Sequence, residues 1–252
     1  RRLASRRQRR RRRSRRHAVR RSAGRWSSSA RIRTSARRWS ARCCGGQFIA
    51  GPHRPDEKER SHATKVFLKP LERLAIFDAD PVPRLVVGQA SRLSGLQANR
   101  QDACPTLALH PGSGSERKNW PEAKWADLLA QLVEATELRL ALVGGEAEGE
   151  RLQHLAAALR PSRREVLQSL PLAELAARLQ GCAAFVGHDS GITHLAAALG
   201  LPTVVLWADT IEEVWRPGGD NVVLLRHDAG LAGMPVPQVL EACLRSARSL
   251  VR

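Results

Sequence analysis

The chain of 252 residues has five cysteines, and none of them stands in a CxxC pair. Because the number is odd and the spacing is irregular, the sequence predicts neither a disulfide framework nor a zinc site. No apolar run reaches the roughly 18 residues that a membrane-spanning helix needs. We also expect no signal peptide, because the first residues lack an apolar stretch. These absences are typical of the reducing cytosol, so we expect a cytoplasmic location.

Acidic residues are absent from residues 1–50, which hold 19 arginines and no lysine. The formal net charge of +18 belongs to this segment, because residues 51–252 carry 23 basic and 24 acidic residues, a net charge of −1. Like charges at this density repel each other and cannot enclose a core, so we predict that the segment is disordered. The basic character therefore says nothing about the ligand of the remaining chain, for which no nucleic-acid partner is expected.

Three interpretations of the arginine-rich segment remain open. Arginine pairs readily with phosphate, so the segment could be a nucleic-acid-binding arm. An organelle transit peptide is also rich in Arg and Ser and poor in acids. The third interpretation is a wrong reading frame or a misjudged start in GC-rich DNA. The sequence favours the third, because the chain does not begin with Met and the charge changes abruptly near Gly51.

Residues 51–103 form a transitional region. Helical spacing of apolar residues over 59–77 is interrupted by Pro70, and two further prolines follow at positions 81 and 83. The apolar residues 85–87 then predict a short strand. We interpret the region as the remnant of an N-terminal domain together with an interdomain linker.

From Cys104 onward, short apolar runs alternate with amphipathic segments. The runs predict strands at 106–110, 138–143, 183–186, 203–207 and 222–225. The amphipathic segments predict helices from Pro121 to beyond Leu132, and at 147–159, 172–179, 191–199 and 239–250. This alternation implies right-handed crossovers and a parallel sheet. The sequence therefore predicts an α/β, Rossmann-like domain over residues 104–252.

Ligands of such sheets bind beyond the carboxyl ends of the strands, where three loops of this chain lie. The first loop reads HPGSGSERKNWP, from His110 to Pro121. Its glycines allow backbone N–H groups to approach an anion closely, and its serines add hydroxyl donors. Arg117 and Lys118 add positive charge where a diphosphate would sit. The alternative is an ordinary strand-to-helix loop with solvated charges. The loop is not a P-loop, because GxxxxGK[ST] does not occur.

The second loop reads Gly144-Gly145-Glu146-Ala147-Glu148 and joins a predicted strand to a predicted helix. Two glycines permit a tight turn and the close approach of a ligand. A carboxylate in the first turn suits the helix dipole and needs no further role. It could instead accept hydrogen bonds from ribose hydroxyls, as in dinucleotide folds.

The third loop reads GHDSGITH, from Gly187 to His194, and leads into a helix of small residues. Its turn exposes the N–H groups of Ser190 and Gly191 at a helix N-terminus, where an anion binds readily. Asp189 is either a helix cap, stabilising by about 1 kcal/mol, or a partner of sugar hydroxyls. His194 falls in the first helical turn, facing the same opening.

Taken in order and spacing, HPGSGSERKNWP, VGGEAE and VGHDSGITHLAAALGLPTVVLW resemble glycosyltransferase family 9, the lipopolysaccharide heptosyltransferases. The resemblance covers residues 104–225, with a weaker similarity in RSHATKVFLKPLERLAI. It implies the GT-B fold, in which two Rossmann-like domains face each other, and it places this chain in the C-terminal half. It further implies a nucleotide-sugar donor, ADP-heptose in the best-known members, and a lipopolysaccharide core acceptor. No metal ion and no other cofactor are implied.

The resemblance also implies roles for individual residues. The diphosphate would be held by the first loop, and the ribose by an acid of the second. The third loop matches the DSG/DTG-x-x-H signature that contacts phosphate and sugar. The implied substrate-binding residues are Ser113, Gly114, Ser115, Lys118, Glu148, Asp189, Ser190, Gly191 and His194.

One departure from the family pattern is large. The family begins with a strand and a glycine-rich GD-type loop in a domain that supplies the catalytic Asp, whereas the Gly-Asp pair here is Gly219-Asp220. We therefore expect a fragment of a heptosyltransferase whose catalytic base is unknown. The intact enzyme would work in the cytoplasm, with peripheral contact at the inner face of the inner membrane. The alternatives are nucleic-acid binding through the arginine-rich tail and a non-catalytic module that binds nucleotide-sugars.

Overall fold

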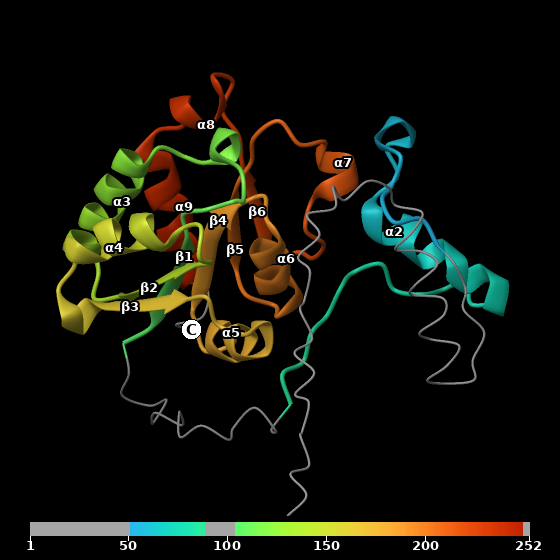
Figure 1. Ribbon diagram of the computed structural model, residues 1–252, viewed down its shortest axis with the longest axis horizontal. Coiled ribbons are helices and arrows are strands. Elements are labelled where there is room, and N and C mark those ends of the chain that lie inside the picture. The colour runs from blue at the N-terminus through green and yellow to red at the C-terminus, as the bar shows by residue number, and fades with distance from the viewer. Residues whose placement is uncertain (1–50, 89–103, 249–252) are drawn as a thin grey trace, which may run out of the picture. The chain divides into compact units, whose positions relative to one another are not determined.

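The computed structural model describes residues 51–88 and 104–248. The predicted disorder of residues 1–50, and the part of the predicted linker between 89 and 103, lie outside these ranges. The described chain begins with short helical segments and continues into an alternating series of strands and helices (Figure 1). The alternation starts at Thr106, close to the position from which the sequence predicts a domain.

Six parallel strands form one sheet in the order β3-β2-β1-β4-β5-β6. Their bounds are β1 Thr106–His110, β2 Arg139–Gly144, β3 Arg164–Gln168, β4 Ala184–His188, β5 Thr203–Leu206 and β6 Val222–Leu225. The central strands are apolar on both faces because helices cover both faces, and every residue of β4 and β5 is buried. The parallel α/β sheet predicted from the sequence is confirmed.

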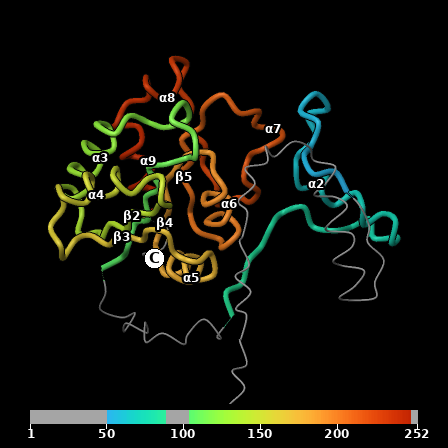
Figure 2. The backbone as a smooth tube through the Cα atoms, viewed as in Figure 1, coloured from blue at the N-terminus to red at the C-terminus, as the bar shows by residue number. Residues whose placement is uncertain are grey.

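Helices pack on both faces of the sheet (Figure 2). Leucines, valines and tryptophans of α3, α4 and α9 share one core with one face of the strands, and α5 and α6 share a second core with the other face. The helix bounds are α2 Ala63–Leu68, α3 Glu122–Ala135, α4 Gly149–Ala157, α5 Leu172–Leu179, α6 Gly191–Ala198, α7 Glu212–Trp215, α8 Gly230–Gly233 and α9 Val236–Arg248.

In the region before Cys104, the predicted strand is wrong and the predicted interruption of the helical pattern at Pro70 is confirmed. Residues 85–87 form no strand, because the N–H of Leu85 donates to the carbonyl of Ala198 at the end of α6 (2.7 Å) and not to a strand. The helical pattern over 59–77 is divided into α2 and a 3-10 helix, Lys69–Leu74. Pro70 explains the division, since it lacks the N–H that an α-helix interior requires.

One strand and two short α-helices of the described chain are also not predicted from the sequence. β3 is an edge strand with the sequence REVLQ, in which only Leu167 is buried, so it carries no apolar run. α7 and α8 have four residues each, too few to show a helical period. Short edge elements of this kind are fixed by tertiary contacts.

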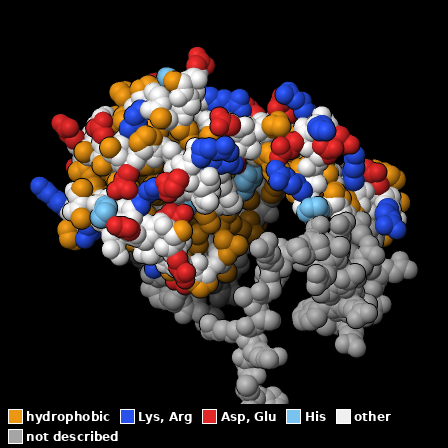
Figure 3. All heavy atoms as spheres, turned by 45° about the horizontal axis from the view of Figure 1, so that its top comes forward, with side chains coloured by type: hydrophobic (Ala, Val, Ile, Leu, Met, Phe, Trp, Pro, Cys, Tyr) orange, Lys and Arg blue, Asp and Glu red, His pale blue; other side chains and the backbone are white. Residues whose placement is uncertain are grey.

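The described surface mixes charges of both signs, as the net charge of −1 for residues 51–252 predicts. Acidic and basic side chains lie interspersed in the space-filling view (Figure 3). Across the ranges 51–88 and 104–248, the model contains no helix with both the length and the apolar character needed to cross a bilayer.

Burial differs sharply between the central and edge strands, which gives a test of the fold. Val186 in β4 is fully buried, whereas Val223 in β6 is 44% exposed. We predict that Val186→Ala lowers the free energy of unfolding by roughly 2 kcal/mol or more, because it leaves a cavity. Val223→Ala should cost less than about 1 kcal/mol. Urea unfolding of the full chain measures both, and equal losses would contradict the sheet order.

Candidate functional site

The sheet brings the three predicted loops together. β1 and β4 are neighbours at its centre, and the strand order runs outward in opposite directions from them. The loops after β1, β2 and β4 therefore meet beyond the carboxyl ends of the strands, at the point where the order reverses (Figure 1). Open α/β sheets bind their ligands at this point.

The loop after β1 folds into a 3-10 helix, Glu116–Lys118, before α3 begins. Gly114 has a φ of +71°, which favours glycine. The hydroxyl of Ser113 turns inward and lies 2.7 Å from Oδ1 of Asn119. Ser115 is exposed, and Lys118 is half-buried. The loop thus presents Ser115 and the ammonium group of Lys118 outward.

Lys118 meets the loop after β4. Its Nζ lies 3.2 Å from Oδ2 of Asp189, although the two residues are 71 positions apart in the sequence. The side chain of Asp189 is 11% exposed and that of Lys118 is 35% exposed. A cation from one loop and a carboxylate from another therefore converge at the centre of the sheet edge.

The N-cap of α6 is Ser190 and not Asp189. The Ser190 hydroxyl accepts a hydrogen bond from the N–H of Thr193 (3.4 Å), which is the capping bond. The helix-cap interpretation of Asp189 is therefore wrong, because the next residue holds that position. Gly191 is exposed at the first turn, where backbone N–H groups are left for a ligand.

His194 lies half-buried in the first turns of α6. Burial lowers the pKa of His194, and the charge of Asp189 offsets only part of this effect. The imidazole is consequently mostly neutral at pH 7. A neutral imidazole can donate an N–H to a ligand but offers it no positive charge.

Glu148 lies between the second loop and the first. Its Oε2 accepts the N–H of Gly145 at 2.9 Å. A Cβ added to Gly112 would lie 2.6 Å from Oε1 of Glu148, so glycine is needed at position 112 for the two loops to touch. The carboxylate precedes α4 without capping it, since no hydrogen bond joins it to that helix's N–H groups.

Comparison with known proteins decides the family. The model of glycosyltransferase family 9 (heptosyltransferase) matches residues 35–233 of this chain. The chain belongs to glycosyltransferase family 9. The family predicted from the three loops is thereby confirmed.

Curated relatives in family 9 share part of their length with this chain. Lipopolysaccharide heptosyltransferase 1 of Pseudomonas aeruginosa is 40% identical over 114 residues, which is 45% of this chain and 31% of the relative. Lipopolysaccharide heptosyltransferase 2 of Escherichia coli is 28% identical over 131 residues, 50% of this chain and 37% of the relative. The chain therefore matches about a third of the length of these relatives.

Solved structures in family 9 have the same fold. Escherichia coli ADP-heptose lps heptosyltransferase II superposes with a TM-score of 0.67 at 21% identity, covering 79% of this chain and 66% of that one. Escherichia coli heptosyltransferase WaaC with ADP-2-deoxy-2-fluoro heptose gives a TM-score of 0.57 at 23% identity, covering 72% and 54%. This likeness confirms the Rossmann-like half of a GT-B fold.

The structure adds two histidines that sequence reasoning did not select. His188 is fully buried, and the N–H of Trp120 donates to its Nε2 at 2.8 Å. His110 is 5% exposed, and its Nδ1 lies 3.3 Å from Oγ of Ser190. Both had a sequence signal, since each is a polar residue at the end of an apolar strand.

A further unpredicted residue is Arg151 on α4. Its guanidinium donates to the carbonyl of Pro111 at 3.3 Å and pairs with Glu116 at 2.9 Å. Arg151 therefore holds the first loop in place through Pro111 and Glu116. Arg151 lies 35 to 40 residues away from these partners in the sequence, so no local sequence pattern reveals the contact.

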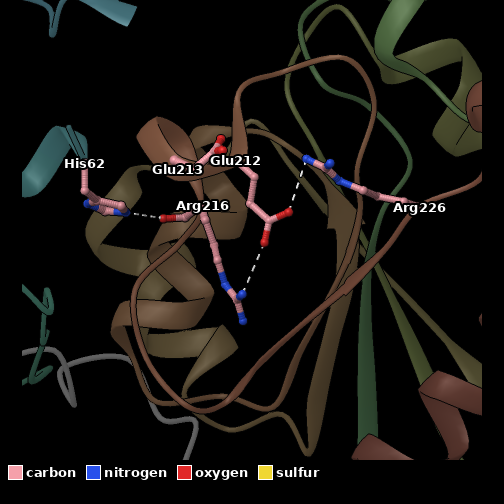
Figure 4. A pocket seen from close by; sticks show the side chains of 5 residues that line it. All are labelled: His62, Glu212, Glu213, Arg216 and Arg226. Carbon is pink, nitrogen blue, oxygen red and sulfur yellow. Dashed lines mark hydrogen bonds and ion pairs between the residues drawn. The ribbon is translucent and has the colours of Figure 1, made fainter. Parts of the chain in front are cut away.

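A charged pocket of about 290 Å³ lies near the same edge (Figure 4). Glu212 of α7 accepts from Arg216 at 3.2 Å and from Arg226 at 3.2 Å. Nε2 of His62 lies 2.8 Å from the carbonyl of Arg216. The charges that line the pocket are thus largely paired with each other, and none belongs to the predicted set.

The described residues contain no cluster of metal-binding side chains. Between 51 and 88, and between 104 and 248, no group of three or more His, Cys, Asp or Glu side chains could hold an ion. The Asp78-x-Asp80 sequence lies on an exposed segment. Asp80 accepts the N–H of Val82 at 2.9 Å and pairs with Arg84.

The two buried histidines predict an acid-sensitive fold. Desolvation lowers the pKa of both His110 and His188 to about 4, whereas unfolding returns each to about 6.5. The unfolded chain therefore binds more protons between these values, so stability is full above pH 6.5 and is lost as the pH falls toward 4.

We predict that His188→Gln, measured by urea unfolding from pH 7 to 4, shows a shallower loss of stability than the wild type. The substitution removes one of the two titrating groups. His154→Gln is the control, because that side chain is 64% exposed and the loss should keep its wild-type slope. A His188→Gln slope equal to that of the wild type would show that the ring is not held neutral.

Proposed function

We propose that this chain binds the donor of a heptosyltransferase, ADP-heptose, for transfer to the lipopolysaccharide inner core. Family membership supports the proposal, as do relatives named lipopolysaccharide heptosyltransferase and the structure of a neighbour with ADP-2-deoxy-2-fluoro heptose. The observation that carries it is the convergence of Lys118 and Asp189 where the strand order reverses. A diphosphate needs a cation there, and a sugar needs a hydrogen-bond acceptor.

Each of the three loops would then bind a different part of the donor. The diphosphate would be held by Lys118, the hydroxyl of Ser115, the backbone N–H groups of Ser113 and Gly114, and the N–H groups at Ser190 and Gly191. Glu148 would accept the ribose hydroxyls. Asp189 would accept hydroxyls of the sugar, and neutral His194 would donate its N–H beside it.

The chemistry of transfer requires stabilisation of the leaving group. An acceptor hydroxyl oxygen forms a bond to the anomeric carbon while the bond from that carbon to the diphosphate oxygen breaks. Negative charge then develops on the departing ADP, and Lys118 with the N-terminus of α6 offsets it. The base that takes the acceptor's proton is not assigned to a residue of this chain.

The proposal extends to organisation and location. Residues 104–252 would form the donor-binding domain, and residues 51–103 would be the remnant of an N-terminal domain together with an interdomain linker. An acceptor built on a lipid brings the enzyme to the inner face of the inner membrane by peripheral contact. Fractionation of cells with and without the acceptor lipid would test this location.

We predict that Lys118→Ala weakens ADP binding roughly 10- to 100-fold, because a charge-assisted hydrogen bond contributes about 1.5–3 kcal/mol. Calorimetric titration of ADP, ADP-heptose and adenosine into the full chain measures the effect. Adenosine affinity should not change, since adenosine carries no phosphate. Lys58→Ala is the control, because Lys58 is an exposed lysine on another element. No binding of ADP to the wild type at millimolar concentration would overturn the proposed function.

We predict that Asp189→Asn separates the two halves of the donor. It removes a negative charge beside the diphosphate and frees Lys118, so ADP should bind at least as tightly as to the wild type. ADP-heptose should bind more weakly, because the amide loses an acceptor for the sugar hydroxyls. The melting temperature should stay nearly unchanged, since Ser190 caps α6. Equal effects on ADP and ADP-heptose would remove the sugar-binding role from Asp189.

A further inference from the structure

The two buried histidines end neighbouring strands. In the register of β1 and β4, His110 lies opposite Gly187, so His188 is only one position further along. Each ring contacts the loop that follows the other strand. His110 of β1 reaches Ser190 after β4, and His188 of β4 reaches the loop after β1.

His188 binds both ends of the first loop. The N–H of Trp120 donates to Nε2 at 2.8 Å, and Nδ1 lies 3.2 Å from the carbonyl oxygen of Gly112. One nitrogen accepts and the other donates only in the neutral ring with its proton on Nδ1. The ring thereby joins the two ends of the segment from Gly112 to Trp120, which contains Lys118.

The surroundings of His188 leave its ring a single orientation. Trp125 packs edge-on against it, with ring centroids 5.5 Å apart, and also against Trp120 at 5.3 Å. The indole N–H of Trp120 donates to the carbonyl of Met234 at 3.1 Å. The carbonyl of His188 accepts the hydroxyl of Thr193 at 2.5 Å, which ties the same residue to α6.

Burial makes these bonds hard to replace. His188 and Trp120 are fully buried, and Gly112 is buried too, so water does not take over the freed groups. An apolar side chain at position 188 would fill the space but leave a peptide N–H and a carbonyl without partners. The ring therefore does more than fill space, because its nitrogens satisfy two peptide groups that lie 68 and 76 residues away in the sequence.

We infer that His188 is a positioning residue, which together with His110 holds the loops after β1 and β4 so that Lys118 and Asp189 face the same diphosphate-sugar ligand. We call the two crossed histidine contacts the histidine brace. The inference rests on the proposed function for its ligand. The brace acts through the loops, because His188 is fully buried and His110 is 5% exposed.

Three substitutions at position 188 separate the two hydrogen bonds. His188→Gln keeps an acceptor within reach of the Trp120 N–H, and His188→Asn keeps a donor near the Gly112 carbonyl. His188→Phe fills the ring volume with neither bond. Val239→Ala is the matched control, because Val239 is fully buried in α9 and lies outside both loops.

The first measurement is calorimetric titration with ADP and adenosine well below each melting temperature. We expect His188→Phe to raise the Kd for ADP at least tenfold with little change for adenosine. The Gln and Asn variants should each recover part of the loss. Val239→Ala should bind ADP within twofold of the wild type even though its melting temperature falls.

The second measurement needs no ligand. Hydrogen exchange at the amide of Trp120 should quicken at least tenfold in His188→Phe and His188→Asn, but stay near the wild-type rate in His188→Gln and Val239→Ala. Wild-type exchange rates in His188→Phe and His188→Asn would overturn the brace. If His188→Phe does not fold, the exchange rates and ADP affinities of His188→Gln and His188→Asn are sufficient to test the brace.

The outcomes distinguish the two proposals. If the wild type binds ADP and a folded His188→Phe chain binds it within twofold, the histidine brace is wrong and the proposed function stands. If the wild type binds no ADP, the proposed function fails. The positioning role then fails with it, whatever the exchange rates show about loop structure.

Discussion

The pairing of β1 with β4 is the contact on which the rest of the site depends. It joins two strands from different halves of the chain and sets the point at which the sheet order reverses. Because the register fixes His110 opposite Gly187, it also fixes where both following loops leave the sheet. A shift by one residue would exchange the faces of the side chains and separate Lys118 from Asp189.

Much of this arrangement could be predicted from the sequence, because its signals are local. The apolar runs of the buried strands and the glycines, hydroxyls and charges of the loops can each be seen within a few residues. β3 was missed because an edge strand needs few apolar residues, and only its Leu167 is buried. Asp189 was considered as a cap because the exact helix start depends on backbone geometry. His188 was missed because its partners lie far away in the chain.

A ligand of this site has to compete with an ion pair that already exists, between Lys118 and Asp189. Lys118 and Asp189 already neutralise each other, so a diphosphate gains the cation only by competing with a carboxylate. A sugar that donates hydroxyls to that carboxylate reduces the competition. For the proposed donor, the pair would therefore discriminate between a free nucleotide and a nucleotide-sugar. Burial lowers the pKa of His194, which reduces any positive charge beside the pair.

The position of β1 also has a consequence for the order of events during synthesis. β1 is the first strand of the sheet to leave the ribosome, yet one of its two neighbours, β4, begins at Ala184. Until that point the nascent chain exposes the unpaired N–H and C=O groups of one edge of β1, an edge that can pair with other chains. The candidate site cannot be complete before α6 has emerged. The proposed donor would therefore not assist the early stages of folding and would only stabilise a domain that is already nearly complete.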